Sequence, residues 1–308
     1  MDLRMLGMAT DSDAATARQL LEAAWQAREL ARAPVSGFRV GAAALDAQGD
    51  VHLGYNVEFA GAPLGETLHA EHAAVAVARR YAAAQKRGDL KIDVIAVTAT
   101  PCGHCRQMLA ERFPHIQIVL GDRGGAAEPT VLSLKEDLLP RAVTFDLLAN
   151  PSKLALCAKD LEASVSAPKN LGATVLTEAL SSFVSADARF SGWPRACVFV
   201  SDAGQSLATG SCMESVAFNP SQGCFQTALM ALASEAQHLS RHGLPITLDA
   251  PSALQALASS MEKVRKVVLV QYQGALVDDQ VIVEHLSSKV FSATTSTLWV
   301  AKPETGNE

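Results

Sequence analysis

The stretch Ile92-Asp93-Val94-Ile95-Ala96-Val97-Thr98-Ala99-Thr100, which ends at Pro101, decides the fold class of this chain. Its apolar and β-branched residues predict a buried strand, because such side chains pack well on a pleated surface and proline ends the run. Helices are expected before and after this strand in the sequence. The other elements expected in the first half of the chain are helices over about 14–32, 68–86 and 102–112 and strands at 38–45, 51–58 and 116–120. Strands that alternate with helices predict a layered α/β domain whose sheet is at least partly parallel.

The composition limits the classes of protein to which this chain can belong. Its 308 residues predict two domains of similar size. Lys and Arg number 26 against 32 Asp and Glu, a net charge of −6, and no basic block occurs, so a nucleic-acid-binding protein is not expected. No apolar run reaches the roughly 18 residues of a membrane span, and the N-terminus lacks a secretory signal. We expect a soluble cytoplasmic protein that binds neither nucleic acid nor membrane.

Six cysteines divide into a Cys-x-x-Cys pair, Cys102 and Cys105, and four scattered residues. An even number suggests disulfides, but so long a chain without an export signal is not a disulfide-dependent scaffold. The scattered residues have apolar neighbours and are expected to be small buried hydrophobic side chains; they are Cys157, Cys197, Cys212 and Cys224.

The second half of the chain repeats the order of strand, glycine turn, strand, proline loop and alanine-rich helix. The corresponding positions, at shifts that rise from 155 to 157, are Ser36-Gly37-Phe38 with Ser191-Gly192-Trp193, Gly54 with Gly210, and Pro63 with Pro220. Chance identity is an alternative, but the shared order of elements favours a duplication. The two copies are expected to join around 150–170.

The strongest chemical signal is His69-Ala70-Glu71, followed after a helix and a strand by Pro101-Cys102-Gly103-His104-Cys105. Both motifs fall at predicted helix N-termini, which favour thiolates over thiols. Two thiolates and one imidazole suit Zn²⁺ and leave a fourth position for water, whose pKa the metal lowers to roughly 7. Glu71 is not needed as a ligand and is placed to move the proton of that water. The pattern therefore predicts a catalytic zinc site.

Other interpretations of these motifs stay open. Cys-x-x-Cys alone is also a redox motif, although an upstream His-x-Glu is not part of that chemistry. A closed structural zinc site would need a fourth ligand, for which His72 and His104 are the candidates. Glu71 is also the kind of acid that favours a helix N-terminus without any catalytic role.

Together these motifs resemble cytidine deaminases, and the combined pattern is the signature of zinc deaminases. Three further segments are similar to that family, so the resemblance covers most of the chain: Ser36–Ala42, Asn56–Phe59 and Met213–Pro220. The similarity is to the longer, two-domain, homodimeric class that binds zinc through one His and two Cys. It implies an α/β fold of two tandem cytidine-deaminase-like three-layer domains with mixed β-sheets, the second degenerate.

The resemblance also implies roles for individual residues. His69, Cys102 and Cys105 would bind one zinc ion per chain, and Glu71 would carry protons. The nucleoside would contact Asn56 and Glu58 at the ribose 3′-hydroxyl, Phe38 beside the pyrimidine, and Val57 and Ala70, with the backbone at Ala70 and Cys102 along the base edge. Independently, Asn56 and Glu58 share a strand face, although a solvated strand end shows the same pattern. Phe38 by itself would more often be a core residue than a stacking platform.

The second copy is expected to lack this chemistry. Counting from the two prolines places Gln226, Thr227 and Ala228 opposite His69, Ala70 and Glu71. Counting from the strands places Ala275 and Asp278 opposite the two cysteines, so no zinc ligand set survives. The second copy would then be structural, forming the dimer and closing the partner's site. Phe218 is the candidate for that contact, with a core phenylalanine as the alternative.

The predicted organisation is a tail over 1–13, a catalytic domain over 14–150, a linker over 151–168 and a degenerate domain over 169–308. The predicted function is zinc-dependent hydrolytic deamination of cytidine and 2′-deoxycytidine to uridine and 2′-deoxyuridine plus ammonia, in pyrimidine salvage. A hydrolase of this kind would take a small nucleoside as its substrate. The alternatives are a deaminase that acts on a base within a polymer and a zinc-stabilised binding protein without catalysis.

Overall fold

The computed structural model describes residues 11–87, 89–124, 127–143, 165–166, 171–237, 240–273 and 279–301. The chain forms two compact units, and each contains one mixed β-sheet with helices packed against it. This is the predicted fold class, α/β with two tandem copies. Among the helices described, none has the length and apolar character that crossing a membrane would require.

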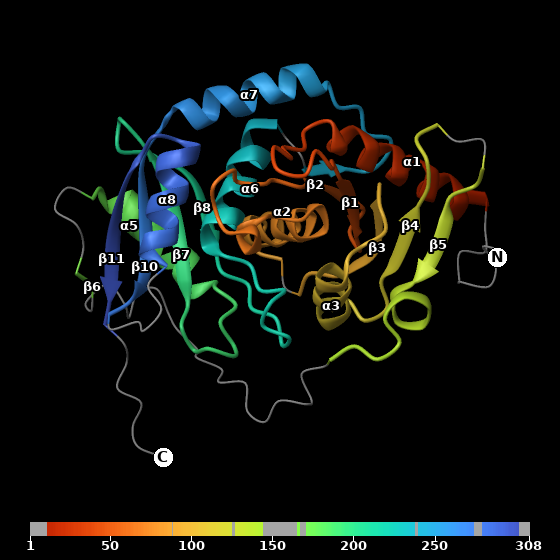
Figure 1. Ribbon diagram of the computed structural model, residues 1–308, viewed down its shortest axis with the longest axis horizontal. Coiled ribbons are helices and arrows are strands. Elements are labelled where there is room, and N and C mark those ends of the chain that lie inside the picture. Colours follow the sequence, from red (N-terminus) through yellow and green to blue (C-terminus); the bar gives the residue numbers. More distant parts are fainter. Residues whose placement is uncertain are drawn as a thin grey trace, which may run out of the picture. The chain divides into compact units, whose positions relative to one another are not determined.

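The sheet of the first unit has β3 (Ile92–Val97), the strand predicted from its β-branched sequence, near its centre. The strand order is β5-β4-β3-β1-β2-β9, and Figure 1 labels the strands from β5 to β2. β3 runs parallel to β4 and antiparallel to β1, so the sheet is mixed. The remaining strands are β1 (Gly41–Asp46), β2 (Asp50–Tyr55), β4 (Gln117–Leu120), β5 (Thr130–Ser133) and β9 (Ser240–His242).

Helices cover both faces of this sheet. α1 (Asp11–Arg28) lies against Gly41, and α2 (Ala70–Ala84) lies against Gly54. Gly54 pairs across the hairpin with the residue after Gly41, and successive strand residues face opposite sides, so the two helices pack on opposite faces. α3 (Gly103–Arg112) packs against α2 (Figure 1). Short helical turns complete the unit at η2 (Leu64–Glu66) and η3 (Leu134–Leu138).

The close approach of β2 to the start of α2 depends on Gly54. A Cβ atom here would lie 2.3 Å from both Ala70 O and Ala74 N, backbone atoms that cannot rotate away. We expect Gly54→Ala to lower the free energy of unfolding by about 2 kcal/mol or more, as overpacking does. Gly65→Ala is the matched control, because a Cβ there meets nothing within 4 Å. Denaturant titration measures both variants, and equal stabilities would contradict this account of the contact.

The second half of the chain repeats the arrangement. Its sheet has the order β6-β11-β10-β7-β8, with β10 parallel to β11 and antiparallel to β7. The strands are β6 (Val165–Ser166), β7 (Arg195–Ser201), β8 (Ser206–Ser211), β10 (Val264–Tyr272) and β11 (Thr294–Val300). The helices are α5 (Ala173–Val184), α6 (Cys224–Gln237), α7 (Ala250–Glu262) and α8 (Gln280–Val290). Strands β7, β8, β10 and β11 therefore correspond to β1, β2, β3 and β4 in order and direction.

Equivalent positions in α2 and α6 differ by fewer residue numbers than the two prolines, Pro63 and Pro220, do. Gly54 packs against the backbone at Ala70, and Gly210 packs in the same way against the backbone at Cys224. The shift between the helices is therefore 224 − 70, or 154, rather than 157.

The predicted alignment of the second copy at this helix was consequently wrong. Bridges join Val57 to Leu68 and Met213 to Gln222, so the loop before α6 is shorter than the loop before α2 by two residues. The residues opposite His69, Ala70 and Glu71 are Gly223, Cys224 and Phe225, not Gln226, Thr227 and Ala228. Ala275 and Asp278 lie outside the described residues.

The first unit includes two segments from the second half of the chain. The first unit contains the chain up to Ala149 together with Ser215–Pro220 and Ala233–Leu257. Its sheet therefore gains β9, which pairs with β2 at the edge. Of the predicted linker, only residues 165–166 are described, as β6, and of the predicted tail, residues 1–10 lie outside the description. The boundaries at 150 and 168 stay predictions.

Candidate active site

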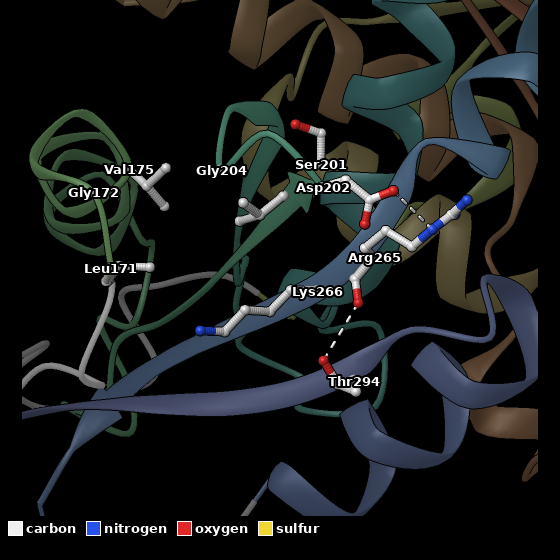
Figure 2. Close-up of a pocket in the computed structure, with 10 residues that line it drawn as sticks. Leu171, Gly172, Val175, Ser201, Asp202, Gly204, Arg265, Lys266 and Thr294 are labelled. Carbon is white, nitrogen blue, oxygen red and sulfur yellow. Dashed lines mark hydrogen bonds and ion pairs between the residues drawn. The ribbon is translucent and has the colours of Figure 1, made fainter.

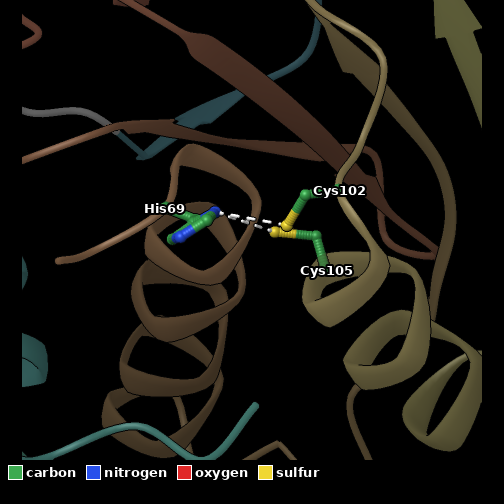
Figure 3. A group of neighbouring side chains, drawn as sticks. All are labelled: His69, Cys102 and Cys105. Carbon is green, nitrogen blue, oxygen red and sulfur yellow. Dashed lines mark hydrogen bonds between the residues drawn. The ribbon is translucent and has the colours of Figure 1, made fainter. Parts of the chain in front are cut away.

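His69, Cys102 and Cys105 come together where α2 and α3 begin. His69 is the N-cap residue of α2, Cys102 is the N-cap residue of α3, and Cys105 lies in the first turn of α3. The Sγ atoms of both cysteines lie 3.5 Å from His69 Nδ1. In Figure 3 the two sulfur atoms and the imidazole point toward one another between the two helices.

These distances fit a zinc ion. Zn–S and Zn–N bonds of about 2.3 and 2.1 Å at tetrahedral angles place the ligand atoms about 3.6 Å apart, close to the 3.5 Å found. Among the described residues, this is the one group of three or more His, Cys, Asp or Glu side chains whose ligand atoms lie within 4.8 Å of one another. Three protein ligands leave a fourth position, which is typical of catalytic zinc sites.

The protonation states of the cluster also suit metal binding. Hydrogen bonds with Cys105 and His69 lower the pKa of Cys102 to about 3, so its sulfur is a thiolate at neutral pH. Burial raises the pKa of Cys105 well above its ordinary value. The cluster thus combines one sulfur that is already a thiolate with one thiol whose proton a metal ion would displace.

Glu71 lies in the first turn of α2, buried beside the cluster with 4% of its surface exposed. Its carboxyl group hydrogen-bonds with Cys105 and interacts with His69. Burial raises the pKa of this carboxyl group, a shift found in general acids and bases that work near neutral pH. An acid that served only the helix dipole would gain nothing from such burial.

His72 contacts the cluster but is not one of its three ligand residues. Its Nδ1 lies 3.4 Å from Cys105 Sγ, and its Nε2 lies 3.0 Å from the carbonyl oxygen of Pro220. It is not part of the ligand group described above, and His104 is exposed. Neither candidate for a fourth ligand therefore supports a closed site among the described residues.

Asn56 holds the loop that carries Phe38. Its Nδ2 donates to Phe38 O at 2.9 Å, and its Oδ1 accepts from Val40 N at 2.8 Å. Asn56 is buried, whereas Phe38 keeps 61% of its surface exposed. The structure thus places Phe38 on the surface and excludes the reading of Phe38 as a core residue within this chain.

Glu58 fixes the same loop through Ser36, whose backbone N–H and hydroxyl group both donate to its carboxylate. Glu214 makes the same bonds with Ser191 in the second copy. Because both copies have this arrangement, the carboxylate has a structural role that does not depend on the metal cluster. A carboxylate offers about four acceptor positions, so this role leaves capacity for a ligand.

Val57 and Ala70 lie directly beside the cluster. The N–H and C=O of Val57 both bond to Leu68, the residue before His69, at 2.9 Å. Ala70 is the buried first residue of α2. Val57 therefore fixes where the chain enters α2, a role that the sequence did not indicate.

The segment Ser215–Pro220, here called the strap, is held by the two helices that carry the cluster. Glu111 of α3 accepts from the Ser215 hydroxyl at 2.7 Å and from the next backbone N–H at 3.0 Å. His72 of α2 contacts the other end at Pro220. Phe218 lies between these anchors with a positive φ of 61° and 65% of its surface exposed.

The sequence did not indicate a role for Glu111, because the residues of the strap that it binds lie more than a hundred residues away in the chain. The available signal was its spacing from Gln107, a residue four positions earlier on the same helix face. Gln107 Nε2 donates to Glu111 at 2.8 Å. The pair forms a buried polar anchor for the strap.

We expect Glu111→Ala to lower the free energy of unfolding by about 2 kcal/mol, because the Ser215 hydroxyl and a backbone N–H lose their acceptor. Glu128→Ala is the control, since Glu128 is an exposed residue that pairs with Arg18, and it should change stability little. Denaturant titration of the two variants makes the comparison. An equally small effect at both positions would show that the anchor does not hold the strap.

The second unit offers no comparable ligand group among its described residues. Arg195 forms ion pairs with Asp279 at 3.3 Å and with Glu214 at 3.9 Å.

A cavity of about 290 Å³ elsewhere in the second unit is lined in part by an ion pair between Arg265 and Asp202 (Figure 2). Its lining holds no His or Cys and consists of Leu171, Gly172, Val175, Val200, Ser201, Asp202, Gly204, Arg265, Lys266 and Thr294.

Comparison with known proteins connects this site to one family. Two family models, both described as the cytidine and deoxycytidylate deaminase zinc-binding region, match residues 14–119 and 134–284. Cytidine deaminase 6 of Arabidopsis thaliana is 34% identical over 67% of this chain and 72% of its own length. Cytidine deaminase of Shewanella amazonensis is 30% identical over 82% of this chain and 80% of its own.

A solved structure of cytidine deaminase from Burkholderia pseudomallei has 37% identity, covers 40% of this chain and 96% of that one, and gives a TM-score of 0.34. The matches to the two family models agree with the duplication, and the two relatives agree with the motifs. The chain belongs to the cytidine deaminase family, whose zinc-binding region both of its halves match.

Proposed function

We propose that this protein catalyses the zinc-dependent hydrolytic deamination of cytidine and 2′-deoxycytidine to uridine and 2′-deoxyuridine, with release of ammonia. The observation that carries this proposal is the three-ligand cluster with buried Glu71 beside it. The relatives named cytidine deaminase support the substrate class and are consistent with pyrimidine salvage.

In the proposed mechanism, His69, Cys102 and Cys105 hold one zinc ion per chain. When bound, zinc lowers the pKa of a coordinated water so that a nucleophile for C4 is available near neutral pH. The Glu71 carboxylate accepts the proton from that water and delivers it to the ring nitrogen next to C4. The carboxylate then takes the remaining proton from the new hydroxyl group on C4 and passes it to the amino group. The C4–N bond breaks, ammonia leaves, and the C4 carbonyl of uridine forms. Proton transfer of this kind contributes about 10²–10⁴-fold to the rate.

Backbone groups at the two helix starts would bind the edge of the base. Neither His69 nor Cys102 caps its helix with a side-chain hydrogen bond. The first N–H groups of a helix have no partner within the helix, and Ala70 provides the first of them in α2. They lie beside the metal ligands, where the reacting edge of the pyrimidine would be.

Asn56 and Glu58 would bind the ribose 3′-hydroxyl, and Phe38 would stack beside the pyrimidine. Support comes from the loop they share, which Asn56 and Glu58 fix at several points while Phe38 stays exposed. Val57 would act between them by fixing the start of α2. The site would thus bind its substrate with a preorganised loop.

We propose that the protein works as a homodimer in which Phe218 reaches the partner's site. Exposed apolar side chains of the first unit support an association surface; among them are Val35, Phe38, Leu64 and Phe218. Subunit exchange between Glu71→Gln and Phe218→Ala chains tests the contact. Mixed dimers should be more active than the sum of the two parents, because one site then regains both residues. Activity that stays at that sum would contradict a contact across subunits.

A cytoplasmic location is part of the proposal. Cys102 and Cys105 are not joined in a disulfide, a state that metal binding requires, and the cytoplasm keeps cysteines reduced.

The substrate class is tested by comparing turnover of free cytidine, free 2′-deoxycytidine and a single-stranded oligonucleotide that contains deoxycytidine. The loss of ultraviolet absorbance follows each nucleoside, and base composition after digestion follows the oligonucleotide. We expect turnover of the free nucleosides only, in keeping with the net charge of −6. Turnover of the oligonucleotide alone would replace this proposal with a polymer-directed deaminase.

A further inference from the structure

Two cysteines of the second unit face each other inside the protein. Cys197 lies on β7, and Cys224 is the first residue of α6. Their sulfur atoms are 3.2 Å apart, and the two residues are 0% and 1% exposed. The contact thus joins the sheet to the helix that packs on it.

The backbone explains why these two side chains meet. Cys197 pairs with Gly210 of the neighbouring strand β8. A Cβ atom on Gly210 would lie 2.5 Å from Cys224 O, so glycine lets the start of α6 approach the sheet at this point. The same approach in the first unit, at Gly54, places alanines at the two equivalent positions, Ala42 and Ala70.

The pair is not part of a metal site. No group of three or more ligand side chains other than the His69 cluster occurs among the described residues. The hydrogen bond with Cys197 and burial both raise the pKa of Cys224 well above its ordinary value. Both features favour a neutral dithiol that reacts slowly and only when the structure opens locally.

We propose that Cys197 and Cys224 are a redox pair that forms a reversible intramolecular disulfide in the second unit. With a small organic disulfide as oxidant, one thiolate attacks it, forms a mixed disulfide and releases one thiol. The second cysteine attacks the protein sulfur of the mixed disulfide and releases the other thiol. The protein loses two hydrogen atoms, and the oxidant is reduced to two thiols.

The cross-link would join two positions that differ by 27 in residue number, and the loop it closes contains the strap, Ser215–Pro220. Closing such a loop restricts the unfolded chain and favours the folded one. The oxidised protein should therefore melt at a temperature higher by about 5 °C or more. Reduction should remove the gain.

The test uses the full-length, zinc-loaded chain incubated with 2-hydroxyethyl disulfide. Free thiols are then alkylated under denaturing conditions, and each cysteine is mapped by mass spectrometry after proteolysis. We expect a disulfide-linked peptide pair that contains Cys197 and Cys224, a higher melting temperature, and reversal of both by 2-mercaptoethanol. Bound zinc protects Cys102 and Cys105, and peptide mapping reports each cysteine separately.

Cys212→Ala is the matched control, because Cys212 is equally buried but its removal leaves the pair intact. This variant should form the cross-link as the parent chain does, and Cys197→Ala should not gain in melting temperature. If Cys197→Ala fails to fold, the peptide map of the parent chain decides alone. If both Cys197 and Cys224 still carry the alkyl label after prolonged incubation with the oxidant, they have stayed free thiols, which would overturn the proposal. A disulfide between either residue and another cysteine would overturn it as well.

Discussion

Glu71→Gln is expected to lower kcat for cytidine by about 10²-fold to 10⁴-fold or more while zinc content stays at the level of the parent chain. Glutamine has the size of glutamate but can neither accept nor return a proton at its side chain. Glu71 is buried beside the cluster, so bulk water cannot readily replace the lost proton carrier. Steady-state kinetics with metal analysis of the same sample makes the measurement.

The control for this change is Glu128→Gln, an exposed carboxylate on a surface loop, which should leave kcat unchanged. A substrate analogue that cannot turn over should still bind to Glu71→Gln, because the substitution leaves the ligands and the loop around Phe38 in place. Full activity of Glu71→Gln would contradict the assignment of proton transfer to this residue.

Cys105→Ala is expected to abolish both zinc binding and deamination. It removes one of three ligand side chains, and His69 and Cys102 alone offer too few ligands to hold a catalytic zinc ion tightly. Losing a buried ligand that also contacts His72 should lower the melting temperature of the zinc-treated protein below that of the parent chain. Metal analysis after desalting, kinetics and thermal melting follow these three effects.

Cys212→Ala is the control for the loss of a buried thiol, because Cys212 is also fully buried but belongs to the second unit. It should keep one zinc ion per chain and full activity. If Cys105→Ala retained stoichiometric zinc, the ligand set would have to include another residue, and His72 would be the first to examine.

The sequence predicted the fold and the metal cluster through two different signals. The β-branched run at Ile92 predicted β3, and the alternation of elements around it predicted a layered α/β domain with a partly parallel sheet. The cluster followed from residue type and spacing, because helix starts place His69, Cys102 and Cys105 in fixed positions relative to the strands that precede them. Both signals are local, so a single sequence suffices to detect them.

Contacts between distant segments could not be predicted in this way. The strap bonds to Glu111 and His72 across a separation of more than a hundred residues, and no local pattern marks which carboxylate it meets. The edge strand β9 joins the sheet of the first unit from the second half of the chain, and its sequence carries no sign of that partner.

The alignment error at α6 has a physical cause. Pro63 and Pro220 lie in loops of different length, and loops accept insertions and deletions more readily than helix–sheet contacts do. Gly54 and Gly210 align the two copies correctly, because glycine is required at each point where a helix backbone contacts the sheet. Counting to the helix from the packing glycine is therefore more reliable than counting from a loop proline.

Among the described residues of its two similar copies, this chain has one zinc ligand cluster, at His69, Cys102 and Cys105, and we propose that this site deaminates cytidine. The most direct test adds zinc in steps to metal-free protein and measures bound zinc and cytidine turnover on the same samples. We predict that activity rises in proportion to bound zinc and levels off at one ion per chain. Activity that requires a second ion, or one tightly bound ion with no turnover of cytidine, would contradict the account.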